Sequence, residues 1–159
     1  IGTVGSDEKI NIAKKNGCDF VINYSKDNFA KKVLEFTGGK GVPVVYDGVG
    51  KNTFEGSIEC LKMKGMMVSF GNASGPVENI DVKKMIQPKG LYFTRPSMAQ
   101  YLTTKEEINE AADMLFKKVK LGKVKVNIFK KYQLEDAIQA HTDLENRKII
   151  GPAIFKPTK

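Results

Sequence analysis

Three residues near the start of the chain have the types and the spacing of an anion-binding site. Gly5 ends a short β-rich run, Ser6 can cap the helix that follows, and Lys9 falls on the first turn of that helix. A helix N-terminus offers free backbone N–H groups, and a lysine there adds positive charge. The pattern predicts a place that holds an anion; the alternative is that Lys9 is only a solvated surface lysine.

The residue that ends this strand also indicates which dinucleotide the site favours. In a doubly wound α/β domain, an acidic side chain at the end of the second strand accepts hydrogen bonds from the adenine ribose of NAD. Here that position is Gly5 and Lys9 follows it, which favours the 2′-phosphate of NADP. Asp7 and Glu8 fall on the first helical positions, where they suit the helix dipole but weaken the local positive field.

Glycines also end two later β-rich runs. Gly48-Val49-Gly50 directly follows the apolar run that ends at Asp47, and Gly71 to Gly75 follows the run that ends at Phe70. Ligands of open α/β sheets lie across the carboxyl ends of the strands, and glycine lets the backbone approach them, although it also makes ordinary tight turns. Neither the G-x-G-x-x-G pattern nor the P-loop pattern is present.

The sequence offers no set of nucleophile, base and orienting group. His141 is the only histidine and is best interpreted as structural, and Cys18 and Cys60 are too few and too far apart for a disulfide framework or a metal site. We therefore predict no catalytic residue and no metal site. If the chain belongs to an enzyme, a cofactor must carry the chemistry.

The elements that position these residues alternate between strand and helix. Short loops between alternating elements predict right-handed crossovers and a parallel sheet covered by helices on both faces. Thr103 with Glu106, or Thr104 with Glu107, forms a capping box for a later long helix. The expected strands are 1–5, 20–22, 43–47, 65–70, 91–93, 124–129 and 149–155, and the expected helices are 8–16, 27–37, 52–61, 104–118 and 134–144.

Composition is typical of a soluble globular protein. The 159 residues are 41% hydrophobic and 28% charged, with no apolar run long enough for a membrane span and no visible signal peptide, so a cytoplasmic protein is expected. A net charge of +8 raises nucleic acid as a partner. The lysines are nevertheless spread along the polar sides of amphipathic segments, so nucleic-acid binding stays a minority alternative.

Taken together, several segments resemble NADPH-dependent quinone oxidoreductases, the zeta-crystallin-like members of the medium-chain dehydrogenase/reductase superfamily. The resemblance covers essentially the whole chain. It rests on Gly2-Thr3-Val4-Gly5-Ser6, Val21-Ile22-Asn23-Tyr24, Val44 to Gly50, Val68 to Gly75, Thr94-Arg95-Pro96-Ser97 and Tyr132-Gln133-Leu134 with Ala140-His141 and Leu144-Glu145.

The resemblance implies a set of cofactor-binding residues and two partners. Gly5, Lys9 and Tyr24 would hold the 2′-phosphate of NADPH together with Arg147, whose guanidinium makes forked phosphate contacts, and Ser6 would also bind the cofactor. Residues of the two later glycine loops would line the rest of the cofactor. Hydride would pass to a quinone without zinc, and two subunits would pair along the edge strand near residues 91–93. The loop residues so implied are Val49 and Gly50 at the middle of the cofactor and Phe70, Gly71 and Asn72 nearer the nicotinamide.

The resemblance also implies that the chain starts at the second strand of a Rossmann-like, doubly wound sheet. Residues 1–159 would then be a partial dinucleotide-binding domain that lacks the first strand and the glycine-rich loop, with a gap at the middle of the sheet. Two alternatives remain for the function: a zinc-free alkene (enone) reductase of the same superfamily, and a noncatalytic structural or RNA-binding protein.

Overall fold

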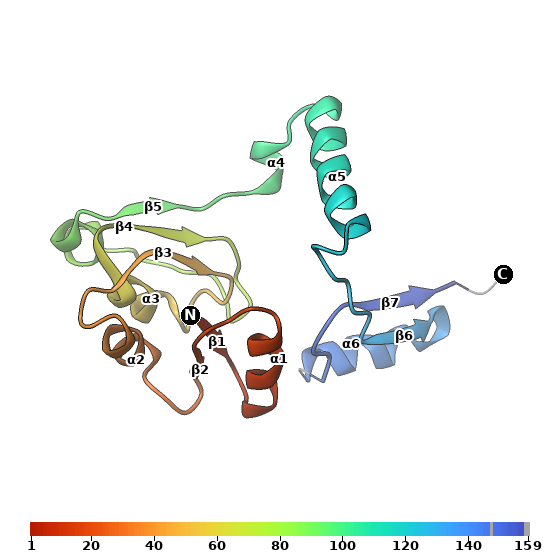
Figure 1. The fold of residues 1–159 in the computed structure, drawn as a ribbon, viewed down its shortest axis with the longest axis horizontal. Helices are drawn as coiled ribbons and strands as arrows, with labels where there is room; N and C mark the ends of the chain where they lie inside the picture. Colours follow the sequence, from red (N-terminus) through yellow and green to blue (C-terminus); the bar gives the residue numbers. More distant parts are fainter. Residues whose placement is uncertain (147, 158–159) are drawn as a thin grey trace. The chain divides into compact units, whose positions relative to one another are not determined.

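The structure is a computed structural model that describes residues 1–146 and 148–157. The chain divides into two compact units, Ile1–Tyr101 (unit 1) and Leu102–Lys159 (unit 2), which are described separately below. Figure 1 shows the elements of each unit.

Every pair of neighbouring strands in unit 1 is parallel. One sheet contains β1 (Gly2–Val4) and β2 (Val21–Asn23), and a second contains β3 (Val42–Asp47), β4 (Leu61–Ser69) and β5 (Tyr92–Thr94) in the order β3-β4-β5. The predicted mixed α/β fold with parallel strands is therefore confirmed. The strands do not form one continuous sheet, because β1 and β3 are not paired.

A cavity of about 370 Å³ separates these two sheets. Its walls include Gly2 and Thr3 of β1, Val33 of α2 (Phe29–Phe36), and Val44 and Asp47 of β3. The division between β1 and β3 is where the sequence predicts a gap in the sheet.

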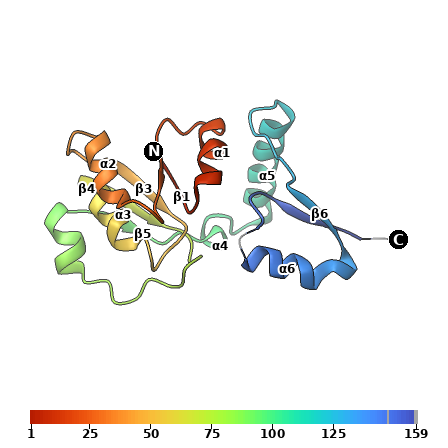
Figure 2. The same cartoon turned by 90° about the horizontal axis from the view of Figure 1, so that it is seen from below.

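Helices of unit 1 lie against the strands (Figures 1 and 2), and two buried clusters fill the space between them. A 3₁₀ turn (Asp7–Lys9) leads into α1 (Ile10–Lys15) beside β1 and β2, and α3 (Phe54–Cys60) contacts β3 and β4. The two clusters are Phe54, Ile58, Leu61, Met67 and Leu91 between α3 and the three-stranded sheet, and Ile22, Ala30, Val33 and Cys60 around α2. Burial raises the pKa of the Cys60 thiol to about 11, so this cysteine is an inert core residue.

The start and the end of α3 differ from the prediction. Thr53, not Asn52, occupies the N-cap position, and β4 begins directly at Leu61. At the other end, Lys89 Nζ donates hydrogen bonds to the carbonyl groups of Ile58, Glu59 and Leu61 at 3.2, 2.8 and 2.7 Å. The last carbonyl groups of a helix lack intrahelical partners, so a distant lysine satisfies groups that no local motif covers.

The segment between β4 and the end of unit 1 contains only short elements. A π-helical turn (Val82–Ile86) and a 3₁₀ turn (Gln87–Lys89) precede β5, and α4 (Met98–Tyr101) follows it. The expected edge strand at residues 91–93 is thus found one residue later.

Unit 2 begins with α5 (Lys105–Lys120), and the capping box predicted for Thr104 and Glu107 is confirmed. Backbone N–H groups of Thr103 and Thr104 donate to Glu107, and these bonds lower the pKa of its carboxyl group. The predicted strand at 124–129 is wrong: β6 is Lys130–Gln133, paired in parallel with β7 (Ala153–Lys156). Pro152 has no N–H group to donate and lies just before β7, where its carbonyl accepts a hydrogen bond from the Phe129 N–H at 2.8 Å.

A buried aspartate joins β6 to the last helix of unit 2, α6 (Ala137–Glu145), which follows a 3₁₀ turn (Leu134–Asp136). Asp143 Oδ2 accepts hydrogen bonds from Lys130 Nζ at 2.9 Å and from the Tyr132 hydroxyl at 2.8 Å, and Oδ1 accepts one from Gln139 at 2.8 Å. These bonds, that of Lys130 first, lower the pKa of Asp143 to about 2. None of the helices in the described residues has the length and the apolar character needed to cross a membrane.

Candidate functional site

Gly5 and Tyr24 lie against each other at the carboxyl ends of β1 and β2. The backbone N–H of Tyr24 donates to the Val4 carbonyl at 3.0 Å, and a Cβ atom added to Gly5 would lie only 2.9 Å from the Tyr24 hydroxyl. A side chain at position 5 would therefore push the tyrosine away. The structure thus brings together two of the residues that the sequence places at the phosphate site.

Ser6 and Lys9 border the same loop, but in a different local structure from the one predicted. Ser6 is extended, its side chain makes no capping hydrogen bond, and the turn it precedes is a 3₁₀ turn, so the prediction of a serine cap is wrong. The backbone N–H of Lys9 closes this turn on the Ser6 carbonyl at 3.2 Å. In the described part of the chain no ion pair engages the Lys9 ammonium group.

The loops after β1 and β2 are joined by side chains that the sequence analysis did not connect. Asp7 forms an ion pair with Lys26 and accepts a hydrogen bond from the Asn23 amide at 2.7 Å, while the Ser25 hydroxyl donates to the Gly5 carbonyl at 2.9 Å. The bond from Lys26 and then that from Asn23 lower the pKa of Asp7. Asp7 is thereby part of the scaffold of the loop.

The two later glycine loops pack directly on each other. A Cβ atom on Gly71 would lie 2.3 Å from the Gly48 carbonyl oxygen. Gly50 has a φ of +87°, and a Cβ atom on it would lie 2.6 Å from the Gly75 carbonyl oxygen. The Ser74 N–H donates to the Val49 carbonyl at 2.7 Å. Neither close approach leaves room for a side chain, so the packing of the two loops requires glycine at positions 50 and 71.

A buried carboxylate holds the Gly48–Gly50 loop from below. Asp47, only 4% exposed, accepts hydrogen bonds on Oδ1 from the backbone N–H groups of Val49 and Gly50 at 2.8 and 2.9 Å. The hydroxyl of Thr53, the N-cap residue of α3, and that of Ser57, within α3, each donate to Oδ2 of the same carboxylate at 2.8 Å. This network fixes the loop relative to β3 and α3, and the sequence analysis missed it. The one sequence signal for this network is Asp47 itself, an acidic residue at the end of an apolar strand.

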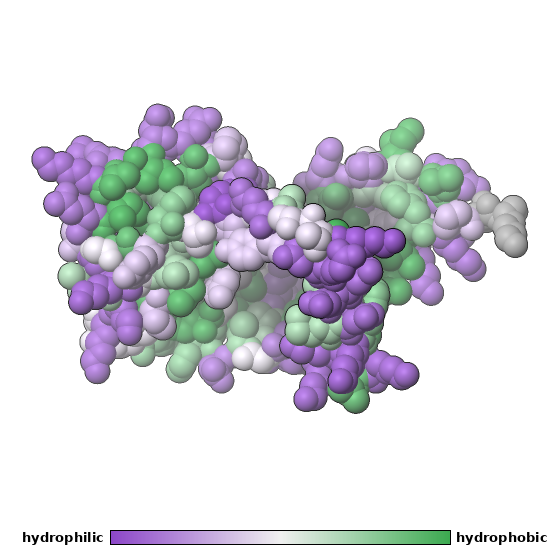
Figure 3. Space-filling view, turned by 90° about the horizontal axis from the view of Figure 1, so that it is seen from above, coloured by the Kyte–Doolittle hydropathy of each residue, from purple (hydrophilic) through white to green (hydrophobic). Residues whose placement is uncertain are grey.

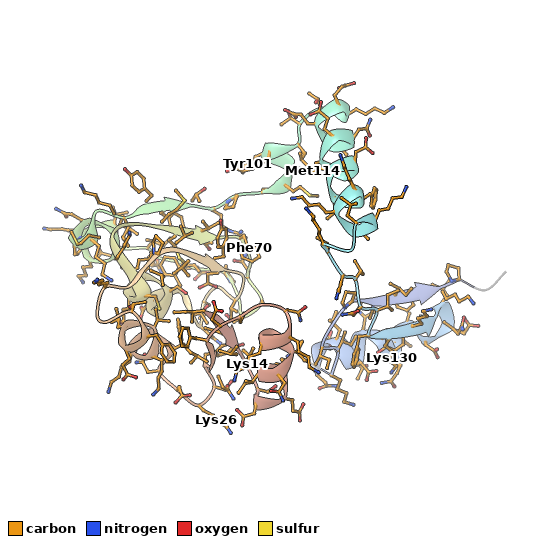
Figure 4. All side chains as sticks on the ribbon, in the orientation of Figure 1. Lys14, Lys26, Phe70, Tyr101, Met114 and Lys130 are labelled. Atoms are coloured by element: carbon orange, nitrogen blue, oxygen red, sulfur yellow. The ribbon has the colours of Figure 1, made fainter. Side chains whose placement is uncertain are left out.

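Phe70 lies beside this loop and remains open to solvent. A Cβ atom on Gly48 would lie 2.9 Å from the Phe70 ring, which is 54% exposed. The ring also borders a hollow of about 620 Å³ on the sheet, lined mainly by Tyr46, Met66, Val68, Phe70, Thr94, Pro96, Met98 and Tyr101. Phe70 is labelled in Figure 4, and Figure 3, which looks onto the β5 side of unit 1, shows hydrophobic residues among hydrophilic ones there.

Three further sequence predictions concern unit 2 or a metal. Arg147 lies outside the described residues. His141 borders an apolar cavity of about 200 Å³ together with Leu144 and Phe155. Among residues 1–146 and 148–157, no group of three or more His, Cys, Asp or Glu side chains is placed to hold a metal ion.

Unit 1 is a mixed α/β unit with parallel strands and with glycine loops at their carboxyl ends. A family model described as zinc-binding dehydrogenase matches residues 1–117. The chain therefore belongs to this family, and the residues described here do not supply a zinc ligand set.

Within the family, the chain is similar to the C-terminal part of quinone oxidoreductases. It is 46% identical over 159 residues to the quinone oxidoreductase of Salmonella typhimurium (99% of this chain, 49% of the relative). It is 41% identical over 158 residues to a 2-haloacrylate reductase from a Burkholderia species (99% and 47%). The crystal structure of Escherichia coli quinone oxidoreductase complexed with NADPH matches with a TM-score of 0.93 and 44% identity, over 98% of this chain and 48% of that one. The chain thus spans about half the length of the curated relatives it matches.

Proposed function

We propose that this chain is the NADPH-binding part of a zinc-independent quinone oxidoreductase, which transfers reducing equivalents from NADPH to a quinone. The observation that carries the proposal is the contact between Gly5 and Tyr24, with Lys9 on the following turn. Gly5 rather than an acid ends the strand, and the nearest carboxylate, Asp7, is paired with Lys26, whereas a cation and a phenol suit a phosphate. NADPH in the related Escherichia coli structure supports the same choice.

In this proposal each loop of unit 1 holds a different part of the cofactor. Gly5, Lys9 and Tyr24, joined by Arg147, bind the 2′-phosphate, and Ser6 also binds the cofactor. Val49 and Gly50 line the middle of the cofactor, and Phe70, Gly71 and Asn72 lie near the nicotinamide. The nicotinamide supplies the hydride, and the residues of this chain bind and orient the cofactor.

We also propose that a further strand fills the space between β1 and β3 and completes one doubly wound sheet. Both strands have an edge without a strand partner in the described residues, and the cavity between them is lined by apolar side chains such as Val33 and Val44 together with polar ones such as Asp47 and Thr53. Unpaired backbone groups inside a sheet are costly, so a strand in this space satisfies them. Residues 1–159 then belong to one dinucleotide-binding domain whose first strand and glycine-rich loop lie in another segment.

The phosphate assignment is tested by measuring NADPH and NADH affinities of the complete polypeptide that carries this chain. Lys9→Ala should weaken NADPH about ten- to a hundredfold, because a charged hydrogen bond is worth about 1.5 to 3 kcal/mol, and should leave NADH unchanged. Lys14→Ala removes a lysine from the last turn of α1 and serves as the control. Equal affinities of the unsubstituted protein for NADPH and NADH would refute the proposal.

An alkene (enone) reductase is the second candidate. The 41% identity to a 2-haloacrylate reductase favours it, since that relative is named for a substrate with an activated double bond. The two candidates share the cofactor site and differ only in the acceptor. Steady-state assays of NADPH oxidation with a series of quinones and a series of α,β-unsaturated carbonyl compounds distinguish them.

The edge strand β5 is our proposed subunit contact in a homodimer. β5 is the last strand of its sheet, and Tyr92 on it is 63% exposed, so a second copy can pair along the free edge. Tyr92→Lys should shift the dimer toward monomer in light scattering after size-exclusion chromatography. A wild-type protein that is monomeric at high concentration would contradict this contact.

A further inference from the structure

The ion pair between Asp7 and Lys26 lies beside the proposed phosphate site. Asp7 is two residues after Gly5, and Lys26 is two residues after Tyr24, on the loop after β2 where Figure 4 labels it. The Asn23 amide donates to Asp7 Oδ1, and Lys26 pairs with Oδ2. Both oxygens of the carboxylate are therefore engaged by the protein.

Because Asp7 lies beside the proposed phosphate site, its bonds to Asn23 and Lys26 affect which ligand binds there. A carboxylate near the end of β1 is suited to accept hydrogen bonds from ribose hydroxyls, and it repels a phosphate on the same ribose. Lys26 supplies the opposite charge and holds the side chain toward the β2 loop. The carboxylate is then neither a free acceptor nor an uncompensated negative charge.

We propose that Lys26 is a specificity-determining residue, which favours a dinucleotide with a 2′-phosphate by neutralising and holding Asp7. This inference rests on the proposed function, because it concerns the same NADPH site. Lys26 acts through Asp7, as a positioning residue, and does not itself contact the phosphate.

The charges of the two loops show how much one lysine changes the local field. Asp7, Glu8, Lys9, Lys26 and Asp27 sum to −1, and without Lys26 they sum to −2. Side-chain exposures of 67% for Lys26 and 55% for Asp7 mean that the pair adds little to folding stability. Replacing Lys26 should therefore change ligand preference without unfolding the protein.

The test measures NADPH and NADH binding by isothermal titration calorimetry, using the complete polypeptide and three variants. Lys26→Met should weaken NADPH roughly three- to tenfold at low salt, less at 0.15 M salt, and leave NADH within about twofold. Asp7→Asn should bind NADPH at least as well as the unsubstituted protein, because asparagine still accepts from Asn23 but carries no charge. The double variant Asp7→Asn/Lys26→Met should recover the unsubstituted affinity for NADPH. Lys14→Met is the matched control.

Each contrary result has a distinct meaning. If Lys26→Met leaves NADPH affinity unchanged while the unsubstituted protein prefers NADPH, the inference is wrong and the proposed function stands. If the double variant binds as weakly as Lys26→Met alone, Lys26 touches the phosphate directly and its action through Asp7 is refuted. If the unsubstituted protein shows no preference for NADPH, both the cofactor assignment and this inference fail.

Discussion

Replacing Asp47 should separate the role of a buried acceptor from the role of its charge. Asp47→Ala leaves the N–H groups of Val49 and Gly50 without their acceptor at a site that is 4% exposed. A buried polar group without a partner costs about 1 to 3 kcal/mol, so two such groups predict a loss of about 2 to 6 kcal/mol in the free energy of unfolding. The hydroxyls of Thr53 and Ser57 can rotate to other partners and are left out of this sum.

Asp47→Asn keeps one oxygen acceptor for the two N–H groups. Its amide can donate to Thr53 and Ser57, because a hydroxyl accepts as well as donates. Only the strengthening of these bonds by the charge is lost, which predicts a smaller cost of about 1 to 2 kcal/mol.

Urea unfolding of the complete polypeptide measures both costs. Asp19→Ala removes an exposed aspartate of unit 1 and should stay within about 0.5 kcal/mol of the unsubstituted protein. NADPH binding provides a second measurement, since Asp47→Ala releases the loop of Val49 and Gly50 and should weaken the cofactor more than Asp47→Asn does. The reasoning is refuted if Asp47→Ala costs less than about 1 kcal/mol, or if both substitutions cost the same.

Three other changes test separate contacts. Gly5→Ala places a Cβ atom 2.9 Å from the Tyr24 hydroxyl and should weaken NADPH binding while NADH binding is kept. Titration of both dinucleotides measures this, and a loss of both would contradict a role confined to the phosphate. Lys89→Met removes the bonds to three carbonyl groups at the end of α3 and should lower stability by about 1 to 2 kcal/mol in urea unfolding; an unchanged midpoint would contradict this. Lys130 and Tyr132 lower the pKa of Asp143 to about 2, so its contribution to stability is present above the unfolded pKa near 4 and is lost as pH falls toward 2. In Asp143→Asn the melting temperature should therefore depend less on pH in that window. A pH profile of the melting temperature that matches the unsubstituted protein would count against this.

Local patterns predicted the elements that local forces determine. The apolar run before Asp47 gave a strand at 43–47, and the structure has β3 at Val42–Asp47. The capping box of Thr104 and Glu107 marked the start of α5 correctly, since all its bonds lie within one turn. Gly5 at the end of β1 was found for the same reason: a glycine after a β-rich run is a local signal.

Contacts between distant residues were the part that the sequence did not reveal. Lys89 caps a helix about thirty residues earlier, and Lys26 pairs with Asp7 across the two loops. Many surface lysines have the same local surroundings, so nothing in their neighbourhoods distinguishes these two. β6 was misplaced because pairing with β7, rather than the apolar run at 124–129, decides where that strand begins.

The two parts of the proposed site follow one physical rule: a carboxylate near a strand end is fully engaged by the protein. Asp47 binds the loop that follows it, and Asp7 is held by Asn23 and Lys26 from the neighbouring loop. With both acids engaged, the groups left to meet a ligand include the backbone at the glycines, the Tyr24 hydroxyl and the ammonium group of Lys9, while Glu8 on the same turn adds a negative charge. Such a surface suits an anionic ligand better than a neutral diol. The proposed preference for NADPH therefore depends as much on how the acids are held as on which cation touches the phosphate.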